Sequence, residues 1–239
     1  VTRSGKSAIE DHFDKHYELE AELARKNKTT ILESIQNIVP TDVTILSIRQ
    51  PEALGLGHAV HCAASAVNDQ PFAVILPDVL VNNHAQEATD LDQMITAYER
   101  DNAAQIMVES VPQDKVNMYG IADCNGVSPA AGESSAISGM IEKPSPEEAP
   151  SNLAVVGRYV LPARVMTLLS ETKPGAGGEI QLTDALDELL KEQAVEAYLM
   201  TGKTYDCGNK LGFLQANIAY GLQHAETAEG LLQFIQKLD

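Results

Sequence analysis

Residues 43–78, VTILSIRQPEALGLGHAVHCAASAVNDQPFAVILPD, decide the fold class of this sequence. Two short apolar runs rich in β-branched residues, Val43 to Ile48 and Phe72 to Leu76, are typical of buried strands. The segment between them, Gly57 to Val67, predicts a helix. The stretch therefore predicts a strand, a covering helix and a second strand, which is the repeating unit of an α/β sheet.

The same alternation continues on the C-terminal side of this stretch. A helical face over Leu91 to Tyr98 precedes a predicted strand over Gln105 to Val111. Short strands separated by Gly, Ser and Pro follow, which predicts a more antiparallel half, over 119–123, 139–142 and 154–160. Helical patterns return over 179–190, 211–222 and 231–238, around a candidate strand over 195–200. We expect one α/β domain with a helical C-terminal tail.

Composition excludes several classes of protein. The chain has 239 residues, of which 44% are hydrophobic and 21% charged, and it contains no apolar run long enough for a membrane span. Its 17 basic and 34 acidic residues give a formal charge of −17, which would repel DNA and anionic membranes. Neither a nucleic-acid nor a membrane partner is therefore expected. The three cysteines are odd in number and far apart, which indicates a reducing cytoplasm rather than a disulfide framework.

Two glycine-containing patterns invite a phosphate-loop or dinucleotide interpretation, and neither fits well. Gly5-Lys6-Ser7 has the ending of a Walker loop, but the first glycine of that motif would precede Val1. Gly55-Leu56-Gly57 precedes a helix, but the third glycine of a dinucleotide fingerprint would fall on Val60. A phosphate-loop kinase or NTPase stays open as a minor alternative.

The loop between the first predicted strand and helix carries Gln50 and Gly55. A glutamine amide can meet both a donor and an acceptor on the edge of a planar base, and a glycine lets the backbone approach that base closely. The loop is therefore a candidate nucleobase site. A plain connecting turn is the more frequent origin of such a composition.

Four further residues carry charge at or after the ends of predicted strands. Asp78 follows the strand ending at Leu76, and Asp206 lies in a loop between a strand-like run and a helix; both offer the hard oxygen ligands that magnesium prefers. Glu142 and Lys143 end a short strand just before Pro144, so that a carboxylate could grip sugar hydroxyls while the ammonium meets a phosphate. Turn caps and a solvated ion pair are the structural alternatives.

Taken in order, these segments resemble one family, the bacterial UTP:glucose-1-phosphate uridylyltransferases of the sugar-nucleotide nucleotidyltransferase superfamily. The resemblance is carried by eight segments: RQP at 49–51, LGLGHA at 54–59, LPDVL at 76–80, MYGI at 118–121, EKP at 142–144, SNL at 151–153 with VGRY at 156–159, GEIQLTDA at 178–185 and YDCG at 205–208. It covers nearly the whole chain, and a series of this length in one order is highly specific.

The resemblance implies a Rossmann-like mixed sheet flanked by helices, and UTP and glucose 1-phosphate as substrates. It implies that Gln50 and Gly55 contact the uracil ring and that Asp78 and Asp206 hold Mg²⁺. The residues that it places around glucose are Tyr119, Gly120, Glu142, Val156, Gly157 and Glu179. Lys143 would contact the sugar phosphate, and Lys143 and Asp78 would be the catalytic residues.

The N-terminal region departs from the family pattern. The family begins with a strand, a glycine-rich loop ending in Gly-Thr-Arg and a lysine that bind the triphosphate, and none of these precedes Val1. We therefore expect residues 1–225 to form a catalytic domain lacking its first strand–loop–helix unit, at least ~30 residues, with 226–239 as a C-terminal helix for homo-oligomer contacts in a dimer or tetramer. Such a chain alone is expected to be inactive and poorly stable. A thymidylyl- or guanylyltransferase, or a non-catalytic sugar-nucleotide-binding relative, are the alternatives.

Overall fold

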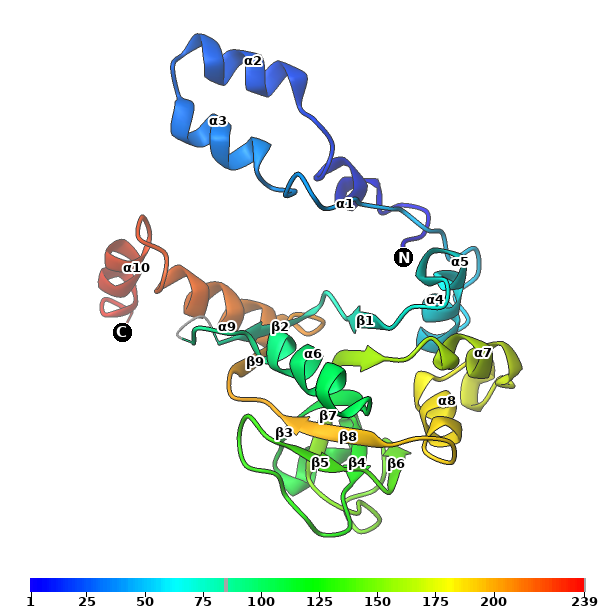
Figure 1. Ribbon diagram of the computed structural model, residues 1–239. Coiled ribbons are helices and arrows are strands. Elements are labelled where there is room, and N and C mark those ends of the chain that lie inside the picture. Colours follow the sequence, from blue (N-terminus) through cyan, green and yellow to red (C-terminus); the bar gives the residue numbers. More distant parts are fainter. Residues whose placement is uncertain (84–85, 239) are drawn as a thin grey trace.

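The central sheet is built around one long strand, β7 (Leu153–Leu161). The order of its strands is β5-β8-β3-β7-β4-β6, and β1 also pairs with β7. These strands are β1 (Phe72–Ile75), β3 (Ala104–Ser110), β4 (Gly120–Asp123), β5 (Ser134–Ala136), β6 (Gly139–Glu142) and β8 (Val195–Leu199). The β3–β8 pair is parallel and the other pairs of the described strands are antiparallel, so the predicted mixed sheet is confirmed. Figure 1 shows the computed structural model, which describes residues 1–83 and 86–238.

A second, two-stranded sheet lies beside the large one (Figure 1). It pairs β2 (Val79–Asn82) with β9 (Lys203–Asp206) in antiparallel fashion. Val79 is opposite Asp206 in this register, so the segment that follows β1 is joined directly to a segment far along the chain. The sequence pattern did not predict β9, because its residues are largely polar.

Helices cover both faces of the large sheet because successive residues of its strands point to opposite sides. In β3, Ile106 and Val108 pack into a core shared with α4 (Leu56–Cys62), α7 (Arg164–Glu171) and α8 (Leu182–Leu189). Met107, between them, packs on the other side with Met94 and Tyr98 of α6 (Asp90–Asp101). The result is a three-layer α/β/α arrangement, as expected for strands that alternate with helices.

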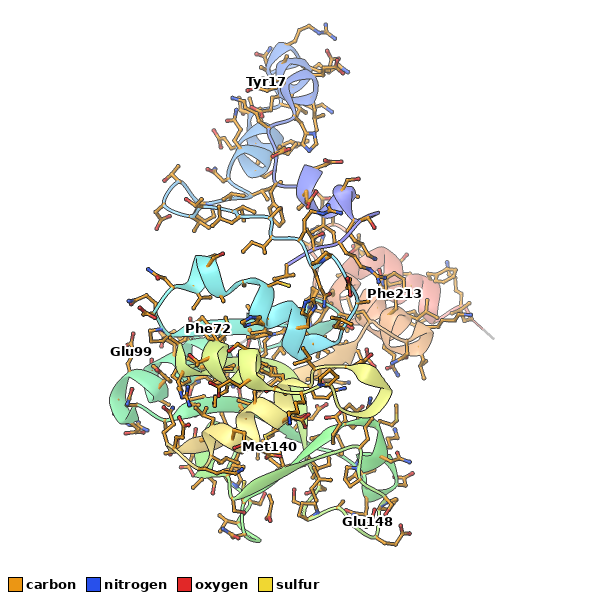
Figure 2. The ribbon with its side chains drawn as sticks, turned by 90° about the vertical axis from the view of Figure 1, so that its right-hand side faces the viewer. Tyr17, Phe72, Glu99, Met140, Glu148 and Phe213 are labelled. Carbon is orange, nitrogen blue, oxygen red and sulfur yellow. The ribbon has the colours of Figure 1, made fainter. Side chains whose placement is uncertain are left out.

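The remaining helices lie at the two ends of the chain and in its connections. They are α1 (Ser7–Asp11), α2 (Tyr17–Arg25), α3 (Thr29–Gln36), α5 (Ala64–Val67), α9 (Lys210–Gly221), α10 (Ala228–Ile235) and the 3₁₀ helices η1 (Gln113–Met118) and η2 (Ala176–Gly178). Figures 1 and 2 show α2 and α3 projecting from the sheet, with Tyr17 far from Met140. None of the helices within the described residues is both long and apolar enough to cross a bilayer.

The predicted strand over 43–48 is wrong. These residues are irregular, and the isolated parallel bridge beside them joins Thr2 to Arg49, the residue that follows the run. The N–H of Thr2 donates to the Ile48 oxygen at 2.8 Å, and the N–H of Gln50 donates to the Thr2 oxygen at 2.8 Å. A single bridge without a longer ladder does not hold a strand, so the β-branched composition is not realised as sheet here.

Candidate active site

The site forms where β7 changes neighbours along one edge. β4 pairs with the beginning of β7, through Ile121 and Ala154, whereas β1 pairs with its end, through Phe72 and Leu161. Between these two pairings the register of β7 against β3 slips, which marks a bulge. Bulges re-aim side chains and interrupt pairing, so the sheet is open at this point.

Gly157 makes this bulge sterically feasible. Its φ is +72°, in the left-handed region, and a Cβ built on it would lie 2.7 Å from Cδ1 of Leu76. The N–H of Leu76 donates to the Gly157 oxygen at 3.0 Å, so the two backbones are in direct contact. A side chain at position 157 would therefore push the end of β1 away.

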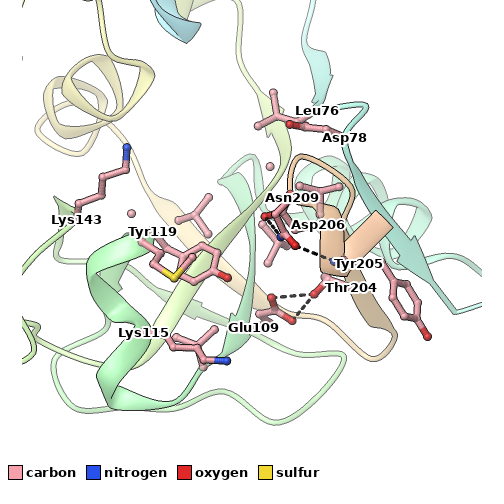
Figure 3. A pocket seen from close by; sticks show the side chains of 18 of the residues that line it. Leu76, Asp78, Glu109, Lys115, Tyr119, Lys143, Thr204, Tyr205, Asp206 and Asn209 are labelled. Carbon is pink, nitrogen blue, oxygen red and sulfur yellow. Dashed lines mark hydrogen bonds between the residues drawn. The ribbon is translucent and has the colours of Figure 1, made fainter. Parts of the chain in front are cut away.

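A cavity of about 960 Å³ occupies the opening. Eight of the predicted site residues line it: Asp78, Tyr119, Gly120, Glu142, Lys143, Val156, Gly157 and Asp206. They come from segments spread over more than half of the chain, and Figure 3 shows side chains from several elements around one space. The cavity lies where β1 and β3 end, which is the edge at which open α/β sheets bind ligands.

Asp78 is positioned by the loop between β1 and β2. Nη1 of Arg158 donates to the Leu76 oxygen at 2.8 Å and Nη2 donates to the Val79 oxygen at 2.5 Å, so one guanidinium holds the backbone on both sides of the aspartate. Burial lowers the pKa of Arg158, and the nearby charge of Asp78 opposes that shift. The backbone carbonyl oxygen of Asp78 also accepts a hydrogen bond from the Cys207 N–H at 2.7 Å, which joins the loop to the end of β9.

Asp206 is the last residue of β9, rather than a residue of the following loop as the sequence predicted. Its Oδ1 accepts the Gly208 N–H at 2.9 Å and its Oδ2 accepts Nδ2 of Asn209 at 2.9 Å. A Cβ built on Gly208 would lie 2.9 Å from Oδ1 of Asp206 and 3.4 Å from Oδ2 of Asp78. The two carboxylates therefore face the same small space beside Gly208.

This carboxylate pair suits a hard cation. No group of three or more His, Cys, Asp and Glu side chains in the described part of the chain has the arrangement of a metal site made by protein ligands alone. Magnesium is usually held by one or two carboxylates together with water and substrate phosphates, so two converging aspartates match its usual protein contribution.

Lys143 lies at the other side of the cavity (Figure 3), and Glu142 also lines it. Nζ of Lys143 is 3.6 Å from Oε1 of Glu142, and the lysine side chain is 62% exposed, so its charge is available to a ligand. Lys143 adopts a φ of +49°, unusual for a residue with a side chain, and its N–H donates to the Tyr119 oxygen at 2.9 Å. The chain therefore turns sharply at the end of β6 and holds the ammonium beside the cavity.

Glu109 and Thr204 complete the cavity wall and were not predicted. The Thr204 hydroxyl donates to both carboxylate oxygens of Glu109, at 2.9 and 2.7 Å, which joins the end of β3 to β9 (Figure 3). Burial raises the pKa of Glu109, and the hydroxyl partly offsets this. Burial, followed by the charges of Glu109 and Asp206, raises the pKa of Tyr119. The signal was present in the sequence, since Glu109 is an acid near the end of an apolar strand, and Asp78 comes shortly after the end of one.

Gln50, Gly55 and Glu179 lie next to this cavity without lining it. The Ile180 N–H donates to the Leu54 oxygen at 2.8 Å, and the Gly57 N–H donates to the Ile180 oxygen at 2.9 Å. Gly55 has a φ of +94°, and a Cβ there would lie 2.9 Å from Cβ of Glu179. The segments 54–57 and 179–181 are therefore in close backbone contact, and Leu56 of the first segment lines the cavity.

Comparison with known proteins gives a consistent result. The model of a family described as nucleotidyl transferase matches residues 11–222. The chain is 48% identical over 240 residues to a UTP–glucose-1-phosphate uridylyltransferase of Haemophilus influenzae, covering 100% of this chain and 81% of that protein. It is 51% identical over 226 residues to one of Escherichia coli, covering 94% of this chain and 74% of that protein.

Solved structures show the same likeness. A UDP-glucose pyrophosphorylase from Acinetobacter baumannii superposes with a TM-score of 0.92 at 50% identity, covering 100% of this chain and 81% of that one. A UTP-bound enzyme from the same organism gives the same values. A UDP-glucose pyrophosphorylase complexed with UDP-glucose gives a TM-score of 0.82 at 38% identity, covering 94% of this chain and 80% of that one.

Proposed function

Because this chain belongs to the nucleotidyl transferase family, and within it to the UTP–glucose-1-phosphate uridylyltransferases, we propose that it forms UDP-glucose and pyrophosphate from UTP and glucose 1-phosphate. The observation that carries the proposal is the convergence of Asp78 and Asp206 in a cavity that Lys143 also lines. Two carboxylates for a cation and one exposed ammonium are the groups needed to bring two phosphorylated substrates together on an acidic protein.

The reaction is an in-line displacement at phosphorus. A phosphate oxygen of glucose 1-phosphate attacks the α-phosphorus of UTP, the bond from that phosphorus to the α,β-bridging oxygen breaks, and pyrophosphate leaves. The attacking phosphate is already anionic at neutral pH, so no enzyme base and no covalent intermediate are required. Catalysis then consists of positioning and charge neutralisation.

The residues of this chain divide that work. Lys143 contacts the phosphate of the sugar and reduces the repulsion between the two anions. Asp78 and Asp206 are the residues that would hold Mg²⁺, and the bound ion would neutralise phosphate charge. Arg158 fixes the loop that carries Asp78 through its two carbonyl contacts.

The two substrates take opposite sides of the site in this proposal. The glucose ring is contacted by five residues that line the cavity, Tyr119, Gly120, Glu142, Val156 and Gly157, and by Glu179 beside it. The uracil is contacted by Gln50 and Gly55 in the loop before α4. The close approach of residues 54–57 to 179–181 supports this arrangement, because it joins the base side and the sugar side of the site.

We assign the enzyme to the cytoplasm and to a homo-oligomer, a dimer or a tetramer. Three free thiols, Cys62, Cys124 and Cys207, suit a reducing compartment. Exposed apolar side chains on α9 and α10 support self-association. In this proposal residues 1–225 are the catalytic part, and residues 226–239 contribute to the contact between subunits. Asp239 lies outside the described residues.

The test is pyrophosphate release by the purified protein with UTP, glucose 1-phosphate and Mg²⁺. We expect Asp78→Ala to lower turnover by about 100-fold or more, since an electrostatic group of the transition state is lost. Asp101→Ala, which removes a carboxylate paired with Arg100 on the surface, is the matched control and should leave the rate unchanged.

Alternative outcomes separate the competing functions. Release from TTP or GTP in preference to UTP would favour a thymidylyl- or guanylyltransferase. UDP-glucose binding without any release would favour a non-catalytic sugar-nucleotide-binding relative. If the protein neither binds UDP-glucose nor releases pyrophosphate, the proposal is contradicted.

A further inference from the structure

The amide of Gln50 has a fixed orientation in the loop before α4. Its Nε2 lies 3.1 Å from the Gly55 oxygen and 3.0 Å from Nδ1 of His58. A backbone carbonyl oxygen can only accept, so the amide must turn its NH₂ group, and not its oxygen, toward Gly55. Both hydrogens of that NH₂ group are then used within the loop.

This orientation also determines the tautomer of His58. Nδ1 must accept the second amide hydrogen, so the ring proton of the neutral imidazole is on Nε2. Nε2 lies 3.8 Å from Sγ of Cys62, one helical turn further along α4, and the thiol sulfur can accept that proton's hydrogen bond. One chain of hydrogen bonds thus runs from the Gly55 oxygen through Gln50 and His58 to Cys62.

The atom left over is Oε1 of Gln50. It has no hydrogen-bond partner among the described residues, and it is not one of their fully buried polar atoms without a partner, so this half-buried residue leaves it at least partly accessible. The sequence suggested a glutamine that offers a donor and an acceptor to a base. In the folded loop its donor is occupied, and an acceptor alone remains.

We propose that His58 is a positioning residue that holds Gln50 with Oε1 facing the base, and that this selects uracil over cytosine. The inference rests on the proposed function, which places Gln50 against the base. Uracil presents an N–H at ring position 3, which Oε1 can accept, whereas cytosine presents an unprotonated nitrogen whose lone pair would oppose Oε1. Turning the amide over to suit cytosine would break both hydrogen bonds of Nε2 and set two oxygens against each other at Gly55.

The sharpest test compares two amide replacements of His58. In His58→Asn the side-chain oxygen takes the place of Nδ1 and can still accept from Gln50, whereas the longer side chain of His58→Gln puts its amide near the place of Nε2. We expect His58→Gln to raise KM for UTP about three- to tenfold and to lower the UTP-over-CTP ratio of kcat/KM by a similar factor, as loss of one hydrogen bond implies. kcat with UTP should change less than KM, and His58→Asn should restore most of the ratio.

A neighbouring histidine supplies the control. His61 lies on the same helix, and its Nδ1 is buried with no hydrogen-bond partner within residues 1–83 and 86–238, so His61→Gln makes the same chemical change without touching Gln50. Its UTP-over-CTP ratio should equal that of the unmodified protein. An unchanged ratio in His58→Gln would overturn the proposal, and so would equal ratios in the Gln and Asn variants.

Nuclear magnetic resonance tests the network without any activity. Long-range ¹H–¹⁵N correlations of the unmodified protein should show His58 as the Nε2–H tautomer, and an Nδ1–H tautomer would overturn the proposal. If that tautomer is found but the protein neither binds nor turns over UTP, the proposed function fails and the selective role falls with it. If UTP is turned over and the His58 variants behave like the unmodified protein, only the role of His58 fails.

Discussion

At the scale of single residues, the site is a set of charged side chains placed where apolar strands end. Asp78 follows β1, Glu109 is near the end of β3 and Asp206 ends β9. β1 and the middle of β3 are apolar, so the acids of these two strands lie at the edge of the sheet, where open α/β sheets bind ligands. Among these acids, Glu109 has its pKa raised by burial.

Glu109 gives a prediction about pH. Burial raises its pKa above the ordinary value of 4.5, so the folded protein binds its proton up to a higher pH than the unfolded chain does. The contribution of Glu109 to the free energy of unfolding therefore falls as pH rises from about 4.5 through the pKa of the folded state. We expect Glu109→Gln to remove this fall, so that the variant gains stability relative to the unmodified protein between pH 4 and 7.

Urea denaturation at a series of pH values measures this difference. Glu192→Gln is a useful control because Arg164 lowers the pKa of Glu192, so its effect on stability has the opposite pH dependence. The contribution of Glu192 to the free energy of unfolding is present at higher pH and is lost as pH falls. If the free energy of unfolding of Glu109→Gln runs parallel to that of the unmodified protein over this pH range, the burial of Glu109 does not destabilise the folded protein.

At the scale of elements, the bulge in β7 organises the site. It carries Gly157, whose lack of a side chain admits Leu76, and Arg158, whose guanidinium holds the carbonyls on both sides of Asp78. A strand irregularity thus places a carboxylate that belongs to a different strand. Asp90 acts similarly at the start of α6, because it accepts hydrogen bonds from the Tyr198 hydroxyl and from the backbone of Thr201 and Gly202 just before β9.

We predict that Arg158→Lys impairs catalysis more than folding. A lysine has a single ammonium and does not reproduce the fork that reaches two carbonyls, so the Asp78 loop should shift. A displacement of about 1 Å costs on the order of 100-fold in rate, and we expect a loss of roughly 10- to 100-fold in kcat/KM. Arg164→Lys, at a surface pair with Glu192, should change the rate less than twofold on the same assay. Equal rates for the two variants would argue against the positioning role of Arg158.

At the scale of the whole molecule, the alternation of strands and helices could be predicted from the sequence, but the pairing of distant segments could not. The strands over 104–110 and 139–142 were predicted within about a residue because short runs with apolar residues are bounded by Gly, Pro or polar residues there. The run over 43–48 has the same composition and is no strand, because a ladder requires a partner.

The candidate site shows the same limit. Asp78 and Asp206 could each be proposed from their places near strand ends, but their convergence depends on the antiparallel pairing of β2 with β9. The hydrogen bond of Gln50 to His58 depends on a helix that turns His58 back over the loop. Periodicity records which face of an element is apolar, and it does not record which element that face meets.

The C-terminal helices give the last prediction, which concerns assembly. Phe213 on α9 is 53% exposed and Phe234 on α10 is 60% exposed, and Leu214 between them in sequence is 58% exposed. The helical residues KLGFLQANIAYG of α9 and AEGLLQFI of α10 contain one charged side chain each, on a protein whose formal charge is −17. We therefore expect two copies to meet on this surface, with little charge repulsion and with apolar area to bury.

We expect the purified protein to be a homo-oligomer that Phe213→Glu with Phe234→Glu converts to monomers. Losing two buried aromatic anchors should raise the dissociation constant by about 100-fold or more, since interface aromatics are often worth 2 kcal/mol or more each. Light scattering after size-exclusion chromatography, at several concentrations, gives the molar mass. Tyr17→Glu is the matched control: Tyr17 is 74% exposed and lies far from Phe213 (Figure 2), so the oligomer should persist. A monomeric unmodified protein at tens of micromolar would contradict the assignment, because an apolar surface of this kind would then be stable in contact with water alone.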